Sequence, residues 1–242
     1  MEKYGYAGPF SLTDTQVVDD LRRLYEDRGH DFLWSKRNQH VSCAAVATAG
    51  QHEEIVKRVE SILGPNVLLW TGHLLPRRPG PSGTDMHRDG LVVKMNGVHI
   101  SLAVTEMTAE TGCMRLIPGS HRWGRVKEKI YSTIKSISFL RSLMGAILFK
   151  KIELQPGQFF LTRGSVLHFV GQNTSDHTRL ALVLRYCSTE TPARNPQPAA
   201  ALAQHNRKHS PLVDDNDSEM CPCLLVQGVD QHGLNDVRPF PQ

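Results

Sequence analysis

The sequence predicts a mainly β fold with flanking helices, in the form of a double-stranded β-helix, or jelly roll. Many short apolar runs are separated by Gly, Pro and Asn turn signals, which is typical of an antiparallel sandwich or barrel. Helical patterns at the start of the chain place helices on one face of that sheet. The length of 242 residues suits one large domain or two small ones. We expect a single domain over residues 1–242.

Residues 1–65 are predicted to form a helical support for the sheet. Apolar residues at helical spacing predict a first helix over residues 11–29, with Ser11 as its cap and Asp14 in the capping-box position. A second apolar stripe predicts a helix over residues 53–63, which the following Gly-Pro pair would end.

The remaining apolar runs are short and predict strands. The Asn96-Gly97 dipeptide is a strong hairpin signal between two of these runs. The predicted strands cover residues 67–75, 91–95, 98–107, 113–117, 152–154, 159–162, 166–170, 180–187 and 223–226.

Two long segments interrupt the strands. Residues 123–151 are rich in Lys and Arg and carry one acid, Glu128. They fit either a packed insertion with a solvated basic face or a lid that docks an acidic partner, and charge reversal at Lys127 and Lys129 would separate the two. Residues 188–217, rich in Pro and polar residues, are predicted to form a mobile loop.

Composition argues against several classes of protein. The net charge of +4 comes without a basic stripe interleaved with aromatics, so we expect no nucleic-acid partner. No run approaches the roughly 20 apolar residues of a membrane helix, and the first residues lack the apolar core of a signal peptide. Five scattered cysteines do not suggest a disulfide framework, and Cys221-Pro222-Cys223 lacks zinc-knuckle spacing. These observations favour a cytoplasmic protein.

A possible metal motif follows a loop rich in Pro, Gly and Arg. His87 and Asp89 are two residues apart, so in extended chain both side chains point to one face. His168 lies late in an apolar strand, where a buried histidine bonded to a carbonyl is the ordinary alternative. Arg179 begins the next strand; it either lies in solvent or meets an anion inside the barrel.

Two imidazoles and one carboxylate on one face of a metal leave three positions open, as in the non-haem Fe(II) oxygenases. Zinc accepts the same ligands. The planar fork of Arg179 matches a distal carboxylate through paired hydrogen bonds. The combination favours Fe(II) with 2-oxoglutarate as co-substrate and O2 over zinc.

The sequence resembles the phytanoyl-CoA dioxygenase (PhyH-like) family of Fe(II)/2-oxoglutarate oxygenases. Residues 112–121 (GCMRLIPGSH) are similar to a segment that follows His-x-Asp in that family, and His168 with Asn173 and Arg179 fits a second signature. Residues 64–70 and 83–87 resemble the branch that holds carrier-dependent amino-acid halogenases. The resemblance implies a cupin-like jelly roll.

The resemblance also implies roles for individual residues. His87, Asp89 and His168 would bind Fe(II), and Arg179 would hold the distal carboxylate of 2-oxoglutarate. Thr84 would contact the co-substrate or serve as a turn residue.

Three further positions are less defined. Ser101 falls where relatives often place an aromatic residue beside the co-substrate. Arg185 would lie near the open metal position or form a structural ion pair, and Arg88 would meet a substrate carboxylate or stay solvated.

One departure from the halogenase branch concerns the reaction. The halogenases carry a small residue where this chain has Asp89, and the small residue leaves room for chloride. Hydroxylation of an unactivated C–H bond, giving succinate and CO2, is therefore expected. Desaturation, cyclisation or epimerisation at the same centre, and a non-catalytic jelly-roll binding protein, are the alternatives. The substrate would be a small molecule (an amino acid, a natural-product intermediate, or a group tethered to a carrier protein or CoA).

Overall fold

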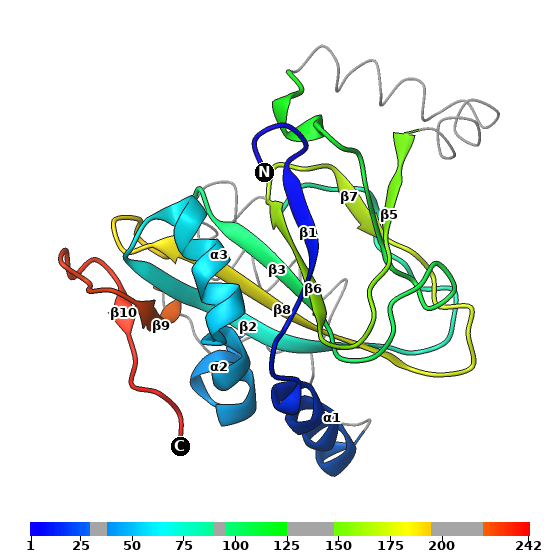
Figure 1. Cartoon of the computed structure of the whole chain (residues 1–242), viewed down its shortest axis with the longest axis horizontal. Helices are drawn as coiled ribbons and strands as arrows, with labels where there is room; N and C mark the ends of the chain where they lie inside the picture. The colour runs from blue at the N-terminus through cyan, green and yellow to red at the C-terminus, as the bar shows by residue number, and fades with distance from the viewer. Residues whose placement is uncertain (30–37, 90–94, 125–147, 195–219) are drawn as a thin grey trace, which may run out of the picture.

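A computed structural model describes residues 1–29, 38–89, 95–124, 148–194 and 220–242. Among these, three helices and two sheets are defined (Figure 1). The helices are α1 (Gln16–Arg28), α2 (Ala44–Gly50) and α3 (Glu53–Leu63), with short 3-10 helices at η1 (Gln39–Val41) and η2 (Ser120–Arg122). The strands are β1 (Tyr6–Ser11), β2 (Val67–Arg77), β3 (Val98–Ala103), β4 (Met114–Leu116), β5 (Lys150–Ile152), β6 (Gln158–Arg163), β7 (His168–Val170), β8 (Arg179–Ser188), β9 (Pro222–Gln227) and β10 (Asp236–Val237).

The strands form a major and a minor sheet. The major sheet has the order β1-β6-β3-β8-β2-β9-β10, and the minor sheet has the order β5-β4-β7. Every pair is antiparallel except β9 with β10. In Figure 1, α2 and α3 lie over β2 and β8 of the major sheet, while β5 and β7 belong to the smaller layer beside it. The predicted mainly β jelly roll with flanking helices is confirmed.

Side chains at alternate positions of the central strands face two different environments, the apolar core under the helices and the space between the two sheets. In β3, Val98, Ile100 and Leu102 join the apolar core under the helices, because alternate side chains of a strand point to opposite faces. His99 and Ser101 between them are buried on the other face. That inner face meets the minor sheet, and apolar residues of both sheets pack there: Ala103, Phe160, Ala181, Met114, Leu116 and Ile152. The major sheet thus presents polar side chains to a buried space between the sheets.

The N-terminal region differs from the prediction. Residues 1–65 are not wholly helical, because β1 pairs with β6 at the edge of the major sheet. Ser11 ends β1 and does not cap a helix. Helix α1 starts after Thr15, and Asp14 accepts a hydrogen bond from the backbone N–H of Gln16 at 2.8 Å. Gly8 and Pro9 have low strand propensity, so the local sequence does not predict a strand here. Pairing with the distant strand β6 overrides this weak local preference.

Several predicted elements are recovered with shifted ends. The predicted strands at 159–162 and 180–187 lie within β6 and β8, whereas the run at 98–107 ends as β3 at Ala103. Helix α2 was not predicted. The strand predicted at 91–95 lies outside the described residues except for Met95, as do residues 125–147 of the predicted lid and 195–217 of the predicted mobile loop. Lys127 and Lys129 belong to these, so both segment predictions stay predictions.

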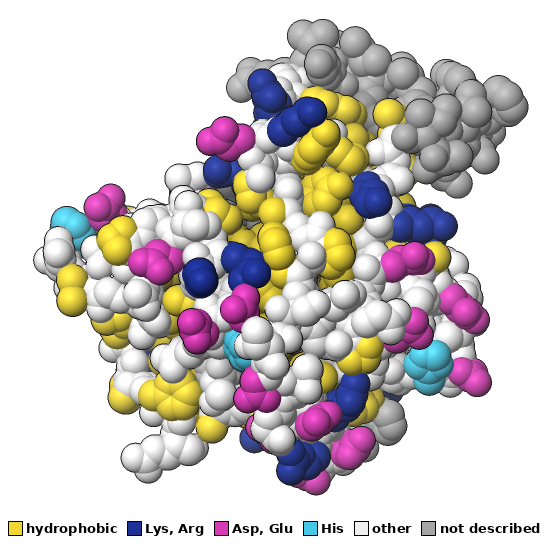
Figure 2. Space-filling model, in the orientation of Figure 1, with side chains coloured by type: hydrophobic (Ala, Val, Ile, Leu, Met, Phe, Trp, Pro, Cys, Tyr) yellow, Lys and Arg dark blue, Asp and Glu magenta, His cyan; other side chains and the backbone are white. Residues whose placement is uncertain are grey.

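The face of the molecule in Figure 2 carries acidic and basic side chains interspersed over the helices, rather than gathered by sign. All five cysteines are free thiols. In the part of the chain that the structure describes, no helix has the length and apolar character needed to span a bilayer.

Candidate metal centre

His87 is held against β7 of the minor sheet. Its backbone N–H donates to the carbonyl of His168 at 3.0 Å, and the N–H of His168 donates back to His87 at 3.0 Å. Residues directly opposed in such a bridge place their side chains on the same face. The two imidazole rings accordingly lie 4.4 Å apart between centroids. A histidine 81 positions along the chain is brought beside the first by this pairing alone.

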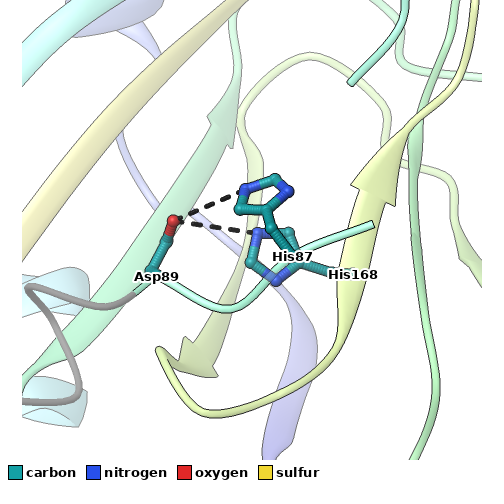
Figure 3. A group of neighbouring side chains, drawn as sticks. All are labelled: His87, Asp89 and His168. Carbon is teal, nitrogen blue, oxygen red and sulfur yellow. Dashed lines mark ion pairs between the residues drawn. The ribbon is translucent and has the colours of Figure 1, made fainter. Parts of the chain in front are cut away.

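Asp89 approaches the same point from the other side. Its backbone N–H donates to the carbonyl of Gly164 at 2.8 Å. Its Oδ1 lies 3.7 Å from Nε2 of His87 and 4.0 Å from Nε2 of His168, as the dashed lines in Figure 3 show. The three ligand atoms lie within 4.8 Å of one another, and no other group of three metal-ligating side chains does so within the described ranges.

The atoms of these side chains that face away from the centre are already hydrogen-bonded. Nδ1 of His87 donates to the carbonyl of Asp85 at 2.7 Å, and Nδ1 of His168 donates to the carbonyl of Val166 at 2.9 Å. Each ring is thereby held in the tautomer that directs an Nε2 lone pair inward. Two imidazole nitrogens and one carboxylate oxygen remain available, a donor set that fits Fe(II).

The burial of the three side chains and the charges around them favour the protonation states that bind a metal. The side chains of His87, Asp89 and His168 are 41%, 12% and 4% exposed, so the centre opens toward solvent on the His87 side. Burial lowers the pKa of His168 to about 4. Burial would raise the pKa of Asp89, but the hydrogen bond from His99 and the positive charge of Arg185 outweigh it, so this pKa lies well below its usual range. A neutral imidazole and an ionised carboxylate are the forms that bind metal.

His99 is the neighbour that the sequence did not reveal. Its Nδ1 donates to Oδ2 of Asp89 at 2.7 Å. It belongs to a row across the inner face of the major sheet, in which Thr162 and Arg185 are its direct partners on β6 and β8. The available signal was the period-2 spacing of His99 and Ser101 in β3, which places both on one face but does not say what they meet.

Arg179 lies in the same space, on β8. Its side chain is among the largest fully buried ones, and its Nη1 donates to the carbonyl of Gly112 at 3.3 Å while Nε has no partner. Arg77 stands directly opposite on β2. Burial and the nearby Arg77 lower the pKa of Arg179 to about 10, which leaves it charged at neutral pH. Among the described residues no carboxylate pairs with either arginine, so neither guanidinium has a counter-ion from this part of the chain.

The other predicted positions lie at varied distances from the centre. Ser101 is buried on the inner face, opposite Phe160 and Val183. Nη2 of Arg185 lies 3.7 Å from Oδ2 of Asp89. Nη2 of Arg88 donates to the carbonyl of Ser120 at 3.0 Å, toward η2.

Thr84 is tied to the edge of β7. Its hydroxyl accepts a hydrogen bond from the backbone N–H of Val170 at 2.8 Å. It lines a cavity of about 640 Å³ together with Arg115 and Phe169. Both roles weighed for Thr84, turn residue and co-substrate contact, stay predictions.

Comparisons with known proteins agree on the fold. The non-heme monooxygenase ThoJ, solved as a nickel complex, covers 100% of this chain and 87% of its own at 18% identity, with a TM-score of 0.70. CytC3 with Fe(II) and alpha-ketoglutarate covers 99% of this chain and 91% of its own at 20% identity, with a TM-score of 0.68.

Sequence comparison identifies the family. The dioxygenase cdmA of Talaromyces verruculosus is 28% identical over 123 residues, which are 47% of this chain; the chain spans only 37% of that relative's length. The profile of the family described as phytanoyl-CoA dioxygenase (PhyH) matches residues 1–181. Enzymes of this family use Fe(II) and 2-oxoglutarate, and the donor set around Asp89 fits that metal. The chain therefore belongs to the phytanoyl-CoA dioxygenase family, with Fe(II) and 2-oxoglutarate as its cofactor and co-substrate.

Proposed function

We propose that this chain hydroxylates an unactivated C–H bond of a small molecule. The balance is one 2-oxoglutarate, one O2 and one substrate C–H giving succinate, CO2 and the C–OH product. The observation that carries the proposal is the meeting of Nε2 of His87, Nε2 of His168 and Oδ1 of Asp89 within 4.8 Å. When bound, Fe(II) would supply the site at which O2 oxidises both 2-oxoglutarate and the substrate C–H bond.

We assign His87, Asp89 and His168 to the metal, which they would hold through one atom each while leaving positions for 2-oxoglutarate and O2. The retained carboxylate occupies the position that the resembling halogenases leave to chloride. This retention supports transfer of hydroxyl to the substrate carbon over halogenation.

Arg179 is our candidate for the co-substrate's distal carboxylate. A buried guanidinium directly opposite a second arginine is costly without an anion, because like charges across a strand pair repel. A dicarboxylate placed there would relieve both burial and repulsion. The lack of a protein carboxylate beside Arg77 and Arg179 among the described residues supports this assignment.

A different outcome at the same centre is the second candidate. Solved relatives of this fold include an alpha-ketoglutarate-dependent epimerase and a carbocyclase of nogalamycin biosynthesis. These outcomes differ from hydroxylation by small displacements of the substrate. The mass of the product separates them, because hydroxylation adds one oxygen, desaturation and ring closure remove two hydrogens, and epimerisation leaves the mass unchanged.

The test begins without substrate. Anaerobic addition of Fe(II) and then 2-oxoglutarate should produce the weak visible charge-transfer band of the chelate. The variant Arg179→Gln should retain Fe(II) but need at least about tenfold more 2-oxoglutarate for the band, since it loses a charge-assisted bond. Arg23→Gln, on the surface of α1, is the matched control and should behave as wild type.

A succinate-release screen over amino acids, free and carrier-bound, then addresses the substrate. Succinate formed with one class, together with a product heavier by one oxygen, supports hydroxylation of that class. No band with the wild-type protein and no succinate with any substrate would favour a non-catalytic jelly-roll binding protein.

A further inference from the structure

We infer that His99, assisted by Arg185, positions Asp89 so that a single carboxylate oxygen faces the metal. This inference rests on the proposed metal centre and assigns the residues that shape it. His99 is a positioning residue here, since it touches the ligand and not the metal.

The two oxygens of Asp89 have different neighbours. Oδ2 accepts the hydrogen bond from Nδ1 of His99 at 2.7 Å and lies 3.7 Å from Nη2 of Arg185. Oδ1 faces the two Nε2 atoms, at 3.7 and 4.0 Å. Both basic side chains thus act on the oxygen turned away from the centre, which orients the carboxylate plane.

His99 is itself firmly placed. It lies in β3, a central strand flanked by β6 and β8, and its side chain is 6% exposed. Its ring stands edge-on to that of His168 at 6.4 Å between centroids. Its Nε2 is buried and has no hydrogen-bond partner among the described residues. What distinguishes His99 from the other buried histidines is its bond to a carboxylate that also faces His87 and His168.

Coordination number explains why one oxygen matters. If His87, Asp89 and His168 each supplied one atom to Fe(II), the remaining positions would be left for 2-oxoglutarate and O2. A carboxylate bound through both oxygens would occupy a position that a ligand needs. By engaging Oδ2, His99 and Arg185 hold Asp89 in the one-oxygen mode and keep that position open.

The test compares two substitutions of equal length. His99→Gln retains an N–H donor toward Asp89, whereas His99→Met fills similar space without a donor. We expect His99→Met to bind Fe(II) about tenfold or more weakly than His99→Gln, as is usual when a ligand loses its outer partner. The Fe(II) dissociation constants are measured anaerobically by calorimetry. The visible spectrum of the Co(II)-substituted protein, which reports coordination number, should differ between the two variants.

The controls separate positioning from folding. His40→Met removes another buried histidine, one that bonds to the carbonyl of Pro222 and not to Asp89, and it should leave the Fe(II) dissociation constant unchanged. Thermal unfolding of each metal-free variant measures the cost to the fold independently of the metal.

Two results would overturn the inference. Equal Fe(II) affinity and equal Co(II) spectra for His99→Gln and His99→Met would remove it while leaving the proposed function intact. Failure of the wild-type protein to bind Fe(II) at all would remove the metal centre, and this inference with it.

Discussion

At the scale of single residues, the two carboxylate oxygens of Asp89 contact different parts of the site. One oxygen faces the imidazoles of His168 in the minor sheet and of His87 beside it, and the other is bonded to the major sheet through His99. Its carboxylate therefore joins the two sheets across the buried space. Because this chain has an acid where the halogenases that it resembles carry a small residue, a substitution of Asp89 tests the proposed reaction type.

Replacing Asp89 by alanine gives the first prediction at this scale. We expect Asp89→Ala to lose hydroxylation by more than about 100-fold, since loss of a ligand exceeds loss of a ligand's partner. The vacated space still faces His99 and Arg185, so chloride should enter and alter the Fe(II)/2-oxoglutarate absorption band. Succinate release and a chloride titration of the band are the measurements.

The control for that substitution is Asp85→Ala. Asp85 is exposed and lies four residues earlier, and its backbone carbonyl rather than its side chain bonds to His87. It should keep wild-type turnover. Full hydroxylation by Asp89→Ala would show that the ligand assignment is wrong.

At the scale of elements, the position of Arg179 depends on the turn that enters β4. Gly112 has φ +79°, and its carbonyl accepts the hydrogen bond from Arg179. A Cβ there would lie 2.6 Å from the carbonyl oxygen of Gly171 and 2.9 Å from that of Gln172. The turn therefore needs glycine both for its backbone angle and for the close approach of the segment that follows β7.

Gly112→Ala should consequently destabilise the fold more than a positive φ alone explains. Gly119 has a matching φ of +78°, but a Cβ there would meet nothing nearer than 3.7 Å. We expect Gly119→Ala to cost about 1 kcal/mol of unfolding free energy and Gly112→Ala at least about 1–2 kcal/mol more. Urea unfolding of both variants measures the difference. Equal costs would mean that the turn yields without strain.

At the scale of the whole molecule, buried histidines link folding to pH. His40 is fully buried, and its Nε2 donates to the carbonyl of Pro222 at 2.9 Å, which ties η1 to β9. Burial lowers the pKa of His40 to about 4, with the bond to Pro222 opposing part of the shift. His168 behaves similarly in the metal-free protein.

The sign of the pH effect follows from these values. Between pH 6.5 and 4 the unfolded chain binds a proton at His40 that the folded chain does not, so stability should fall as pH falls through this window and level off below pH 4. At pH 5 the loss from His40 should be about 2 kcal/mol. Urea unfolding of metal-free protein at pH 7.5 and pH 5 measures it. His40→Gln, which retains an N–H donor, should show a smaller difference; an unchanged difference would contradict the assignment.

Much of the architecture could be predicted from local patterns. The runs that became β6 and β8 are apolar segments bounded by turn residues, and the helix at Glu53–Leu63 follows from an apolar stripe at helical spacing. The strand β1 could not, because only its pairing with β6, about 150 residues later, stabilises it.

The sequence by itself determined the ligand chemistry: a His-x-Asp pair, a later histidine and a following arginine in an order that resembles one oxygenase family. Only the tertiary structure decided that His99 bonds to Asp89 and that Arg77 stands opposite Arg179. The physical reason is that strand register is a property of the assembled sheet. A shift of one residue in the register of their strands would leave every local sequence pattern unchanged, but it would turn the side chains of His99 and Arg179 away from the site.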